Sequence, residues 1–481
     1  MDTGGILVNV TLLTAARRGV PRFGFGNELV LQSVNDSAVA AAVAHSGGTI
    51  ARYPGGTPSD YWLYEAGWIR PGSPCLNSLD AARDYPKRPA TPVQWRAFLD
   101  ASGVPDTVLD VCQLTCTLEH QMAGLKAHEA AGTPIHLVEL GNEMYDSSRQ
   151  DVMAAYPQPS DYAAAMAPWV SAIQAAWPRA QVALVGVRWN AYSSAREDAW
   201  NEEVLLNSSA GAQADATTLH IYVPWGDGAG DGSDGDDIAR RLAAAATYAF
   251  NNGVHVTKTV PPRMRVWVTE LGVYPPGPLD GTWLLGLFYA AMALLLPQAI
   301  ATLDVLLPYC LLCADPTAPA FTTAQYGPVI PPAAAGTVPV LRRPVGEAQA
   351  AVFGAVAGAT AMVPLAFSPN APLTAAEPRS RTLVGWSLER RDDASRRQGS
   401  PRIGSGGSTA SAIILNQGSA TQTLVGTGAA LADCVHPAAP ADVTRANLTA
   451  DELLHSRTVA TRRADGSRAL ELPPYSVCSL F

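Results

Sequence analysis

Two glutamates, each directly after an apolar run, could carry out one reaction together. Glu143 ends the segment Glu139–Glu143, and Glu270 ends the segment Arg265–Glu270. Hydrolysis of a glycoside needs two carboxyl groups: one protonates the departing oxygen, and the other attacks the anomeric carbon or activates water. Further polar side chains stand at the ends of these and other apolar runs. They are Arg52, Asn142, His220 and Tyr222.

The apolar runs alternate with helix-like stretches, which is typical of a parallel sheet. Eight such units over about 340 residues predict a (β/α)8 barrel, in which the carboxyl ends of the strands meet at one face. The glutamates would follow the fourth and seventh strands and face each other across the axis. A doubly wound open sheet is the alternative, but Gly404–Gly407 lies in a polar loop and is no phosphate loop after a buried strand. The predicted strands are Arg22–Leu29, Gly48–Tyr53, Thr107–Cys116, Ile135–Leu140, Gln181–Trp189, Thr217–Val223, Arg265–Leu271 and Thr302–Leu312.

After about residue 362 the pattern changes to short alternating segments separated by polar loops such as Arg390–Ser411. This change predicts a small accessory β-sandwich. The apolar run Ile6–Leu13 precedes the first barrel strand and could add an edge strand to that sandwich. We therefore expect an α/β protein of two domains. The (β/α)8 TIM barrel would span 21–362, and the sandwich would span 363–481 together with 1–20.

The polar strand ends resemble those of the large clan of retaining (β/α)8 glycoside hydrolases, clan A. Arg52–Trp62, which reads Arg-Tyr-Pro-Gly-Gly-Thr-Pro-Ser-Asp-Tyr-Trp, and Glu139–Glu143 are similar to glycoside hydrolase family 79, the heparanase and β-glucuronidase group. Leu472–Val477 also resembles the last strand of that group's accessory domain, so the resemblance spans nearly the whole chain. The chain departs from the heparanases in lacking a basic groove, which argues against a long sulfated polysaccharide as substrate.

This resemblance implies a role for each polar residue. Glu143 matches the acid/base, which would be protonated at rest, and Glu270 matches the nucleophile. Asn142 matches the residue that holds the 2-hydroxyl of the sugar. The other matches are supporting groups: Arg52 and Tyr222 would hydrogen-bond the nucleophile, Asp60 would bind sugar hydroxyls, and Tyr309 would lie near a uronate carboxylate. His220, which ends the same predicted strand as Tyr222, is expected from its spacing to be a hydrogen-bonding, substrate-binding wall residue rather than a metal ligand.

Composition and motifs argue against several other classes. The 33 basic and 42 acidic side chains are scattered, whereas nucleic acid and anionic membranes need a concentrated basic face. The apolar stretch Trp283–Leu296 would form a helix of about 21 Å, too short for a hydrocarbon core of roughly 30 Å, so we expect a buried helix. His220 has no histidine or cysteine at ligand spacing, and neither a metal nor a cofactor is expected. Glu139 is expected to be structural and paired with an arginine.

The seven cysteines predict no disulfide scaffold, because a core of this size needs no covalent staples. Cys310-Leu-Leu-Cys313 lies in an apolar run and is expected to hold buried thiols. No signal peptide opens the chain. The family resemblance favours an extracellular, cell-wall, lysosomal or vacuolar location. Because this resemblance and the missing signal peptide point in different directions, the location stays open.

The sequence thus predicts a retaining glycosidase that cleaves a β-glucuronide, or a related cell-wall or proteoglycan glycoside, through a covalent glycosyl-Glu270 intermediate. An α-L-arabinofuranosidase of the same clan is the first alternative, since its second strand also tends to end in Arg-Tyr-Pro-Gly-Gly. A non-catalytic carbohydrate-binding barrel is the second, although the presence of both Glu143 and Glu270 argues against it. An NAD enzyme is disfavoured by the missing phosphate loop.

Overall fold

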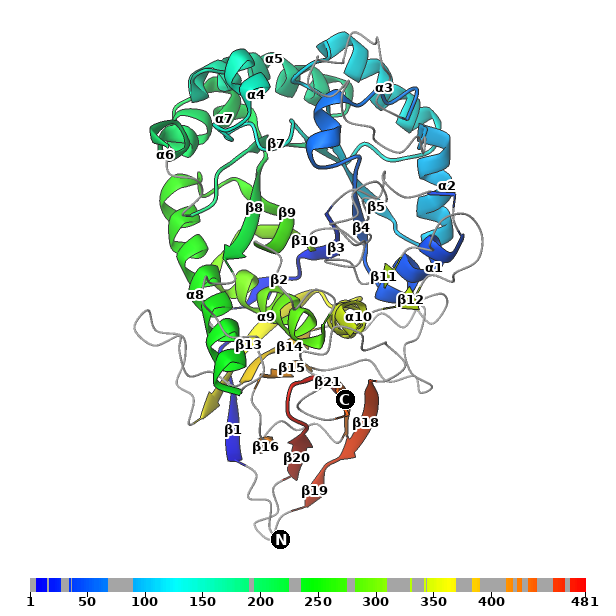
Figure 1. Ribbon diagram of the computed structural model, residues 1–481, viewed down its shortest axis with the longest axis vertical. Helices are drawn as coiled ribbons and strands as arrows, with labels where there is room; N and C mark the ends of the chain where they lie inside the picture. The colour runs from blue at the N-terminus through cyan, green and yellow to red at the C-terminus, as the bar shows by residue number, and fades with distance from the viewer. Residues whose placement is uncertain are drawn as a thin grey trace.

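The structure is a computed structural model, and it describes most of the barrel and the strands of a second, antiparallel sheet. Figure 1 shows the barrel with its surrounding helices, the sheet beyond it, and two helices, α9 and α10, between the two. The described residues are 6–14, 17–26, 34–35, 37–67, 90–189, 194–224, 235–274, 282–308, 329–330, 341–342, 344–368, 383–389, 412–417, 422–425, 431–438, 453–462 and 468–481.

Eight parallel strands close into a barrel in chain order, with the last strand paired to the first. Each lies within or overlaps a predicted strand, so the predicted (β/α)8 barrel is confirmed. The strands are β3 (Arg22–Phe25), β4 (Ile50–Tyr53), β5 (Asp106–Asp110), β6 (Leu137–Glu139), β7 (Gln181–Val185), β8 (Ala216–Pro224), β9 (Arg265–Tyr274) and β10 (Leu303–Pro308).

Helices cover the outside of the barrel, and local sequence explains where they begin and end. In α2, for example, Thr91 and Gln94 form a reciprocal capping box, and Gly103 ends the helix in the left-handed conformation at φ 69°. The helices are α1 (Ser37–Ser46), α2 (Pro92–Ser102), α3 (Leu118–Ala130), α4 (Gln150–Ala155), α5 (Pro159–Ala176), α6 (Ala195–Asn201), α7 (Ser209–Gln213), α8 (Gly235–Thr259), α9 (Trp283–Ala299) and α10 (Pro344–Val356).

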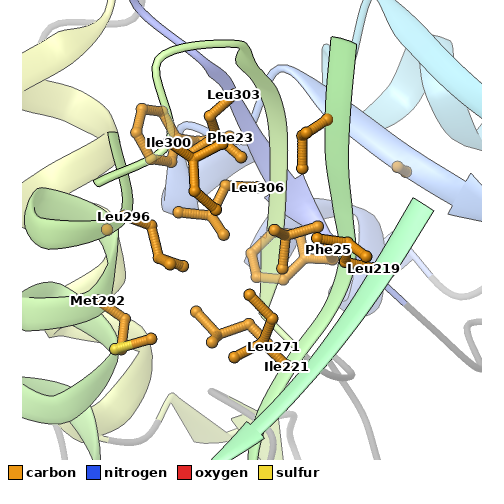
Figure 2. Packing of buried hydrophobic residues seen from close by; sticks show 14 of the residues in the cluster. Phe23, Phe25, Leu219, Ile221, Leu271, Met292, Leu296, Ile300, Leu303 and Leu306 are labelled. Carbon is orange, nitrogen blue, oxygen red and sulfur yellow. The ribbon is translucent and has the colours of Figure 1, made fainter. Parts of the chain in front are cut away.

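The barrel strands are apolar on both faces, as expected of parallel strands covered by helices. Inside the barrel, side chains from seven of the eight strands form one buried layer; they are Ile50, Val108, Leu137, Ala183, Ala216, Trp267, Val305 and Leu307. On the outside, Figure 2 shows Leu306 and Leu271 of the strands among side chains of α9 such as Met292 and Leu296. This packing holds the strand ends, and the polar groups on them, in fixed positions.

Helix α9 is buried from Trp283 to Pro297 between the barrel and the sheet, as predicted for a short apolar helix. The Trp283 indole donates to the carbonyl of Tyr475 at 2.7 Å, and the Trp386 indole donates to the carbonyl of Leu294 at 2.6 Å. These bonds tie the helix to strands of the second domain. Among the described residues, no helix has the length and apolar character to cross a membrane.

The second domain is one continuous, mostly antiparallel sheet whose two halves pack together around a common core. Its strands run in the order β18-β17-β21-β15-β14-β13-β1-β16-β20-β19, and β2 pairs with β13. The strands are β1 (Ile6–Leu12), β2 (Arg18–Gly19), β13 (Ala361–Ser368), β14 (Leu383–Glu389), β15 (Ala412–Asn416), β16 (Gln422–Val425), β17 (Leu431–His436), β18 (Leu454–Val459), β19 (Thr461–Arg462), β20 (Arg468–Leu472) and β21 (Ser476–Leu480), and the short β11 (Val329–Ile330) and β12 (Leu341–Arg342) pair separately.

The predicted accessory β-domain is confirmed, with one correction for the N-terminal strand. Strand β1 is not an edge strand, because it pairs with β13 on one side and with β16 on the other. Helix α10 ends at Val356 and β13 begins at Ala361. We therefore propose a domain division between these two elements, a few residues before the predicted residue 362, with 1–20 belonging to the sheet domain.

The expectation that the chain needs no covalent staples is wrong for the second domain. Cys434 and Cys478 lie opposite each other on β17 and β21 and form a disulfide across a separation of 44 residues. Cys116 is also disulfide-bonded, whereas Cys112 is a buried free thiol. Cys310 and Cys313 lie outside the described residues.

Candidate active site

Arg52, the residue before the last one of β4, is completely buried and lies at the centre of the carboxyl-end face of the barrel. Its Nε donates to Glu139 at 2.6 Å, and its Nη1 donates to Glu270 at 2.7 Å. Its Nη2 donates to Asp110 at 2.9 Å and to the side-chain oxygen of Asn142 at 3.1 Å. One guanidinium therefore fixes groups from three other strands and from the loop after β6.

Three carboxylates share this one cation, and burial shifts the pKa of one of them. Burial raises the pKa of Asp110 well above its ordinary value; Arg52 opposes the shift, and the neighbouring Glu139 adds to it. Glu139 also accepts a hydrogen bond from Thr269 Oγ1 at 3.1 Å. The predicted structural pairing of Glu139 with an arginine is confirmed.

Glu270 is held at both carboxylate oxygens. Arg52 donates to Oε1, and the Tyr222 hydroxyl donates to Oε2 at 2.5 Å, as the resemblance implies. The β8–β9 register shifts just before the His220–Glu270 pair, where Thr269 has no partner of its own. Such a bulge breaks the strict alternation of side chains, so Thr269 and Glu270 both reach groups inside the barrel. The two hydrogen bonds fix the orientation of the carboxyl group.

Glu143 lies in the loop after β6, in a backbone conformation that side-chain-bearing residues rarely adopt. Its φ is 51°, and Gly141 two residues before it has φ 91°. Non-glycine residues at positive φ are uncommon and gather at functional sites. The Glu143 Oε1 accepts from the Tyr145 hydroxyl at 3.1 Å and lies 2.9 Å from His220 Nδ1. The unusual turn therefore aims Glu143 at His220 and the centre of the site.

Glu143 and His220 form an ion pair. Burial alone would raise the pKa of Glu143, but the hydrogen bond and charge of His220, helped by Tyr145 and Arg149, lower that pKa to about 2. Burial lowers the pKa of His220, but the charge of Glu270 and the bond to Glu143 more than compensate, so it is raised. The expectation that Glu143 is protonated at rest is therefore not met by this arrangement.

Asp60 lies behind Asn142 rather than at the surface of the site. Its carboxylate is completely buried: Oδ1 accepts from the backbone N–H of Asn142 at 3.3 Å, and Oδ2 accepts from Arg149 Nη1 at 2.7 Å. Burial raises the pKa of Asp60 to about 7, although Arg149 opposes the shift. The geometry favours a supporting role for Asp60 over the direct contact with sugar hydroxyls that the resemblance implies.

Arg149 is the main site residue that the sequence did not reveal. Besides Asp60 it contacts the Asn142 carbonyl oxygen at 3.3 Å and the Asp151 carboxylate at 3.1 Å. Arg149 lies six positions after Glu143 in an irregular loop. It therefore belongs to no periodic pattern of the sequence that could have indicated it. Asp110 could have been found, because it also ends an apolar strand; the predicted strand ran on to Cys116 and hid it. Tyr309 lies outside the described residues.

One oxygen of Glu143, one nitrogen of His220 and one oxygen of Glu270 all lie within 4.8 Å of one another. Three such groups could hold a cation, but both oxygens of Glu270 already accept hydrogen bonds. The Arg52 guanidinium beside Glu270 also opposes a second positive charge. These contacts disfavour a metal ion between the three groups.

Solved glycosidase structures resemble this chain along nearly its whole length. A family 51 α-L-arabinofuranosidase from Bifidobacterium longum has a TM-score of 0.67 at 15% identity, with 98% of this chain and 99% of that chain covered. A family 51 arabinofuranosidase from Xanthomonas axonopodis pv. citri has a TM-score of 0.66 at 13% identity, with 99% of each covered. A 4-O-α-L-rhamnosyl-β-D-glucuronidase from Fusarium oxysporum 12S has a TM-score of 0.63 at 14% identity, with 99% and 100% covered.

No protein-family model matches the sequence, and no curated protein sequence matches it. At identities of 13–15% the structural likeness shows the fold alone: an eight-stranded barrel with an accessory sheet domain. The similarity includes structures of family 51, and membership of family 79 in particular is not shown.

Proposed function

We propose that this protein is a retaining glycoside hydrolase with Glu270 as nucleophile and Glu143 as acid/base. The observation that carries the proposal is the spacing of the two groups, since an oxygen of Glu143 and an oxygen of Glu270 lie within 4.8 Å of each other. Retaining enzymes hold their carboxyl groups about 5–5.5 Å apart, and inverting enzymes about 6.5–9.5 Å apart. The short spacing is that of the retaining class and favours double displacement.

The surrounding residues support this division of roles. Arg52 and Tyr222 hydrogen-bond the two oxygens of Glu270 and orient the group for attack on the anomeric carbon. Because the Asn142 side-chain oxygen accepts from Arg52, its amide NH₂ is the end that can donate to the 2-hydroxyl of the sugar. Such a contact gains strength in the transition state. A carbohydrate is therefore the partner that this site fits.

Within this reaction class, an α-L-arabinofuranoside is the substrate that we favour. The guanidinium groups of Arg52 and Arg149 are both engaged by carboxylates of the protein itself, which suits a neutral sugar better than a uronate. Arabinofuranosidases are also the activity named for several similar structures. The three disulfide-bonded cysteines Cys116, Cys434 and Cys478 support an oxidising location such as the cell exterior.

A β-glucuronide is the second candidate, and two observations favour it. The Arg52–Trp62 and Glu139–Glu143 motifs resemble family 79, and the structurally similar Fusarium protein is named a rhamnosyl-glucuronidase. Tyr309, the residue that the resemblance places near the uronate carboxylate, lies outside the described residues. The choice between the two sugars therefore depends on measurement.

Hydrolysis of nitrophenyl glycosides tests the proposal. We expect release of nitrophenol from the α-L-arabinofuranoside, with the β-D-glucuronide slower, and NMR of the first-formed sugar should show the anomeric configuration retained. Glu270→Gln protein prepared in parallel controls for contaminating glycosidases. Sugar binding without turnover of any glycoside would support the non-catalytic alternative, and an inverted product would refute the double displacement.

A further inference from the structure

His220, on β8, lies between the two carboxylates of the site. Its Nδ1 is 2.9 Å from Glu143 Oε1 and 3.5 Å from Glu270 Oε2, and the side chain is 3% exposed. A single ring nitrogen thus faces both the acid/base and the nucleophile, and water has little access to it. A proton on Nδ1 would be attracted by both carboxylates but hydrogen-bonded to Glu143.

We propose that His220 and Glu143 hold the catalytic proton between them, and that loss of the negative charge on Glu270 in the glycosyl-enzyme leaves His220 neutral. This inference rests on the proposed function and adds a residue to it: His220 positions and stores the proton that Glu143 delivers. The chain then needs no protonated Glu143 at rest, which resolves the conflict between the acid role of Glu143 and its ion pair.

The charges that face His220 come from three other elements. Glu143 in the loop after β6 and Glu270 on β9 favour the imidazolium, and Arg52 on β4 disfavours it. Burial also disfavours the imidazolium; the charge of Glu270 is the largest single influence that opposes burial, and Glu143 opposes it through both a hydrogen bond and its charge. When Glu270 becomes an uncharged ester, that largest influence disappears, and Glu143 alone then opposes burial and Arg52. The protonation of His220 therefore follows the charge of the nucleophile.

The proton balance of the first half-reaction is closed. At rest His220 is an imidazolium, and Glu143 and Glu270 are both carboxylates. As the bond between the anomeric carbon and the departing oxygen breaks, the proton moves from His220 Nδ1 to Glu143 and from Glu143 to that oxygen, and Glu270 bonds to the anomeric carbon. The glycosyl-enzyme then contains neutral His220, ionised Glu143 and an uncharged ester, and the three groups have the same net charge as before.

The second half-reaction reverses these transfers. Glu143 takes a proton from the water that attacks the anomeric carbon, the ester bond breaks, and the proton returns from Glu143 to His220. A neutral His220 matters at this step because an imidazolium beside Glu143 stabilises the carboxylate and makes it a weak base. The same histidine thus supplies the proton in the first half and withdraws its charge in the second.

Titration of His220 by NMR tests this inference without any substrate. The signal among the eight histidines is assigned by its loss in His220→Asn protein. We expect wild-type His220 to titrate above the ordinary range of histidine, and Glu270→Gln, which removes the charge but keeps the shape, to lower the midpoint by about one pH unit or more. His255, which contacts Asn201 and the Val187 carbonyl away from the site, is the matched control and should not shift.

The same midpoint for His220 in wild-type and Glu270→Gln protein would overturn the inference, as would a neutral His220 at pH 6 in the wild type. A second measurement uses enzyme trapped with a 2-fluoro glycoside, in which His220 should be neutral; an imidazolium there would also overturn it. If no fluoro glycoside reacts, the proposed function fails, while the titrations of the free protein still decide the coupling of His220 to Glu270.

Kinetics of His220→Asn separate proton delivery from a merely structural role. Glycosides with poor leaving groups need the proton and should slow by about 10²-fold or more, whereas a dinitrophenyl glycoside, which leaves unprotonated, should react in its first step nearly as fast as with wild type. The basic limb of the pH profile should also move to lower pH, because a carboxyl now holds the proton alone. Equal slowing of both substrates would contradict the proposal.

Discussion

The barrel holds an arginine between carboxylates at each of its two ends, and the two clusters differ in their access to water. At the amino ends of the strands, Arg22 bonds Asp106 at 3.2 Å and Asp304 at 2.6 Å, with 29% of its side chain exposed. At the carboxyl ends, Arg52 bonds three carboxylates with its side chain completely buried. Similar residue types therefore work in two different dielectric environments.

The difference shows why only one of these clusters can do chemistry. Around Arg22, water screens the charges, so the pairs contribute little and perturb little. Around Arg52, desolvation is costly and each charge affects its neighbours strongly, which raises the pKa of Asp110 and His220 and lowers that of Glu143. The buried cluster lies at the carboxyl ends of the strands, where barrel enzymes place their reacting groups.

The largest expected effect comes from the nucleophile. Glu270→Gln should lower kcat by at least about 10⁴-fold, because it removes the group that forms the covalent intermediate. Its counterpart at the other end, Asp304→Asn, should keep nearly full activity. Steady-state hydrolysis of the best nitrophenyl glycoside measures both. Comparable losses in the two variants would mean that the carboxyl-end cluster has no special role.

The second prediction concerns stability. Arg52→Met leaves buried carboxylates without their cation and should lower the free energy of unfolding by about 3–5 kcal/mol. Arg22→Met breaks solvated pairs and should cost about 1 kcal/mol or less. Urea unfolding followed by circular dichroism gives both values. Similar costs at the two ends would remove the physical basis of the comparison.

A smaller effect is expected at Arg149, which acts through Asn142 rather than on the sugar. Arg149→Gln should lower kcat/KM by about 10²-fold, because a displacement of about 1 Å at the reacting groups costs that much. Arg265→Gln, which loosens the half-exposed bond to Asp304 at the other end, is the control and should have no effect on activity. An unaffected Arg149→Gln enzyme would exclude Arg149 from positioning Asn142.

The smallest effect is a pH dependence of stability. The pKa of Asp60 is about 7 in the folded protein, above its value in an unfolded chain, so the native state binds the extra proton. The resulting stabilisation is complete below about pH 4 and is lost as the pH rises through about 7. Relative to Asp60→Asn, the wild type should lose roughly 1 kcal/mol between pH 6 and pH 7. Parallel pH profiles of unfolding for the two proteins would contradict this assignment.

Strand alternation and polar strand ends allowed the barrel and the Glu143–Glu270 pair to be predicted, because these features depend on local periodicity and on a rule that applies to every parallel barrel. The contacts of Arg52 and Tyr222 with Glu270 were implied by the family resemblance. The interior place of β1 and the Cys434–Cys478 bond were missed, because strand order and register in an antiparallel sheet depend on residues far apart in the chain.

The protonation of the site residues also could not be predicted from the sequence. The ion pair of Glu143 and His220 depends on burial and on distances between three strand ends, and the role of Asp60 depends on its burial behind Asn142. A sequence motif specifies which residues follow one another along the chain. Which of them carries a proton depends on burial and on the charges that the fold places around each group.

Trapping the covalent intermediate tests the central claim most directly. Protein incubated with an activated 2-deoxy-2-fluoro glycoside of the accepted sugar is digested with protease, and the labelled peptide is sequenced by mass spectrometry. The double displacement proposed here predicts one adduct per chain, on Glu270, and none in Glu270→Gln protein. An adduct on any other residue, or steady hydrolysis of the fluoro glycoside with inversion and no adduct, would contradict the assignment of Glu270 as the nucleophile.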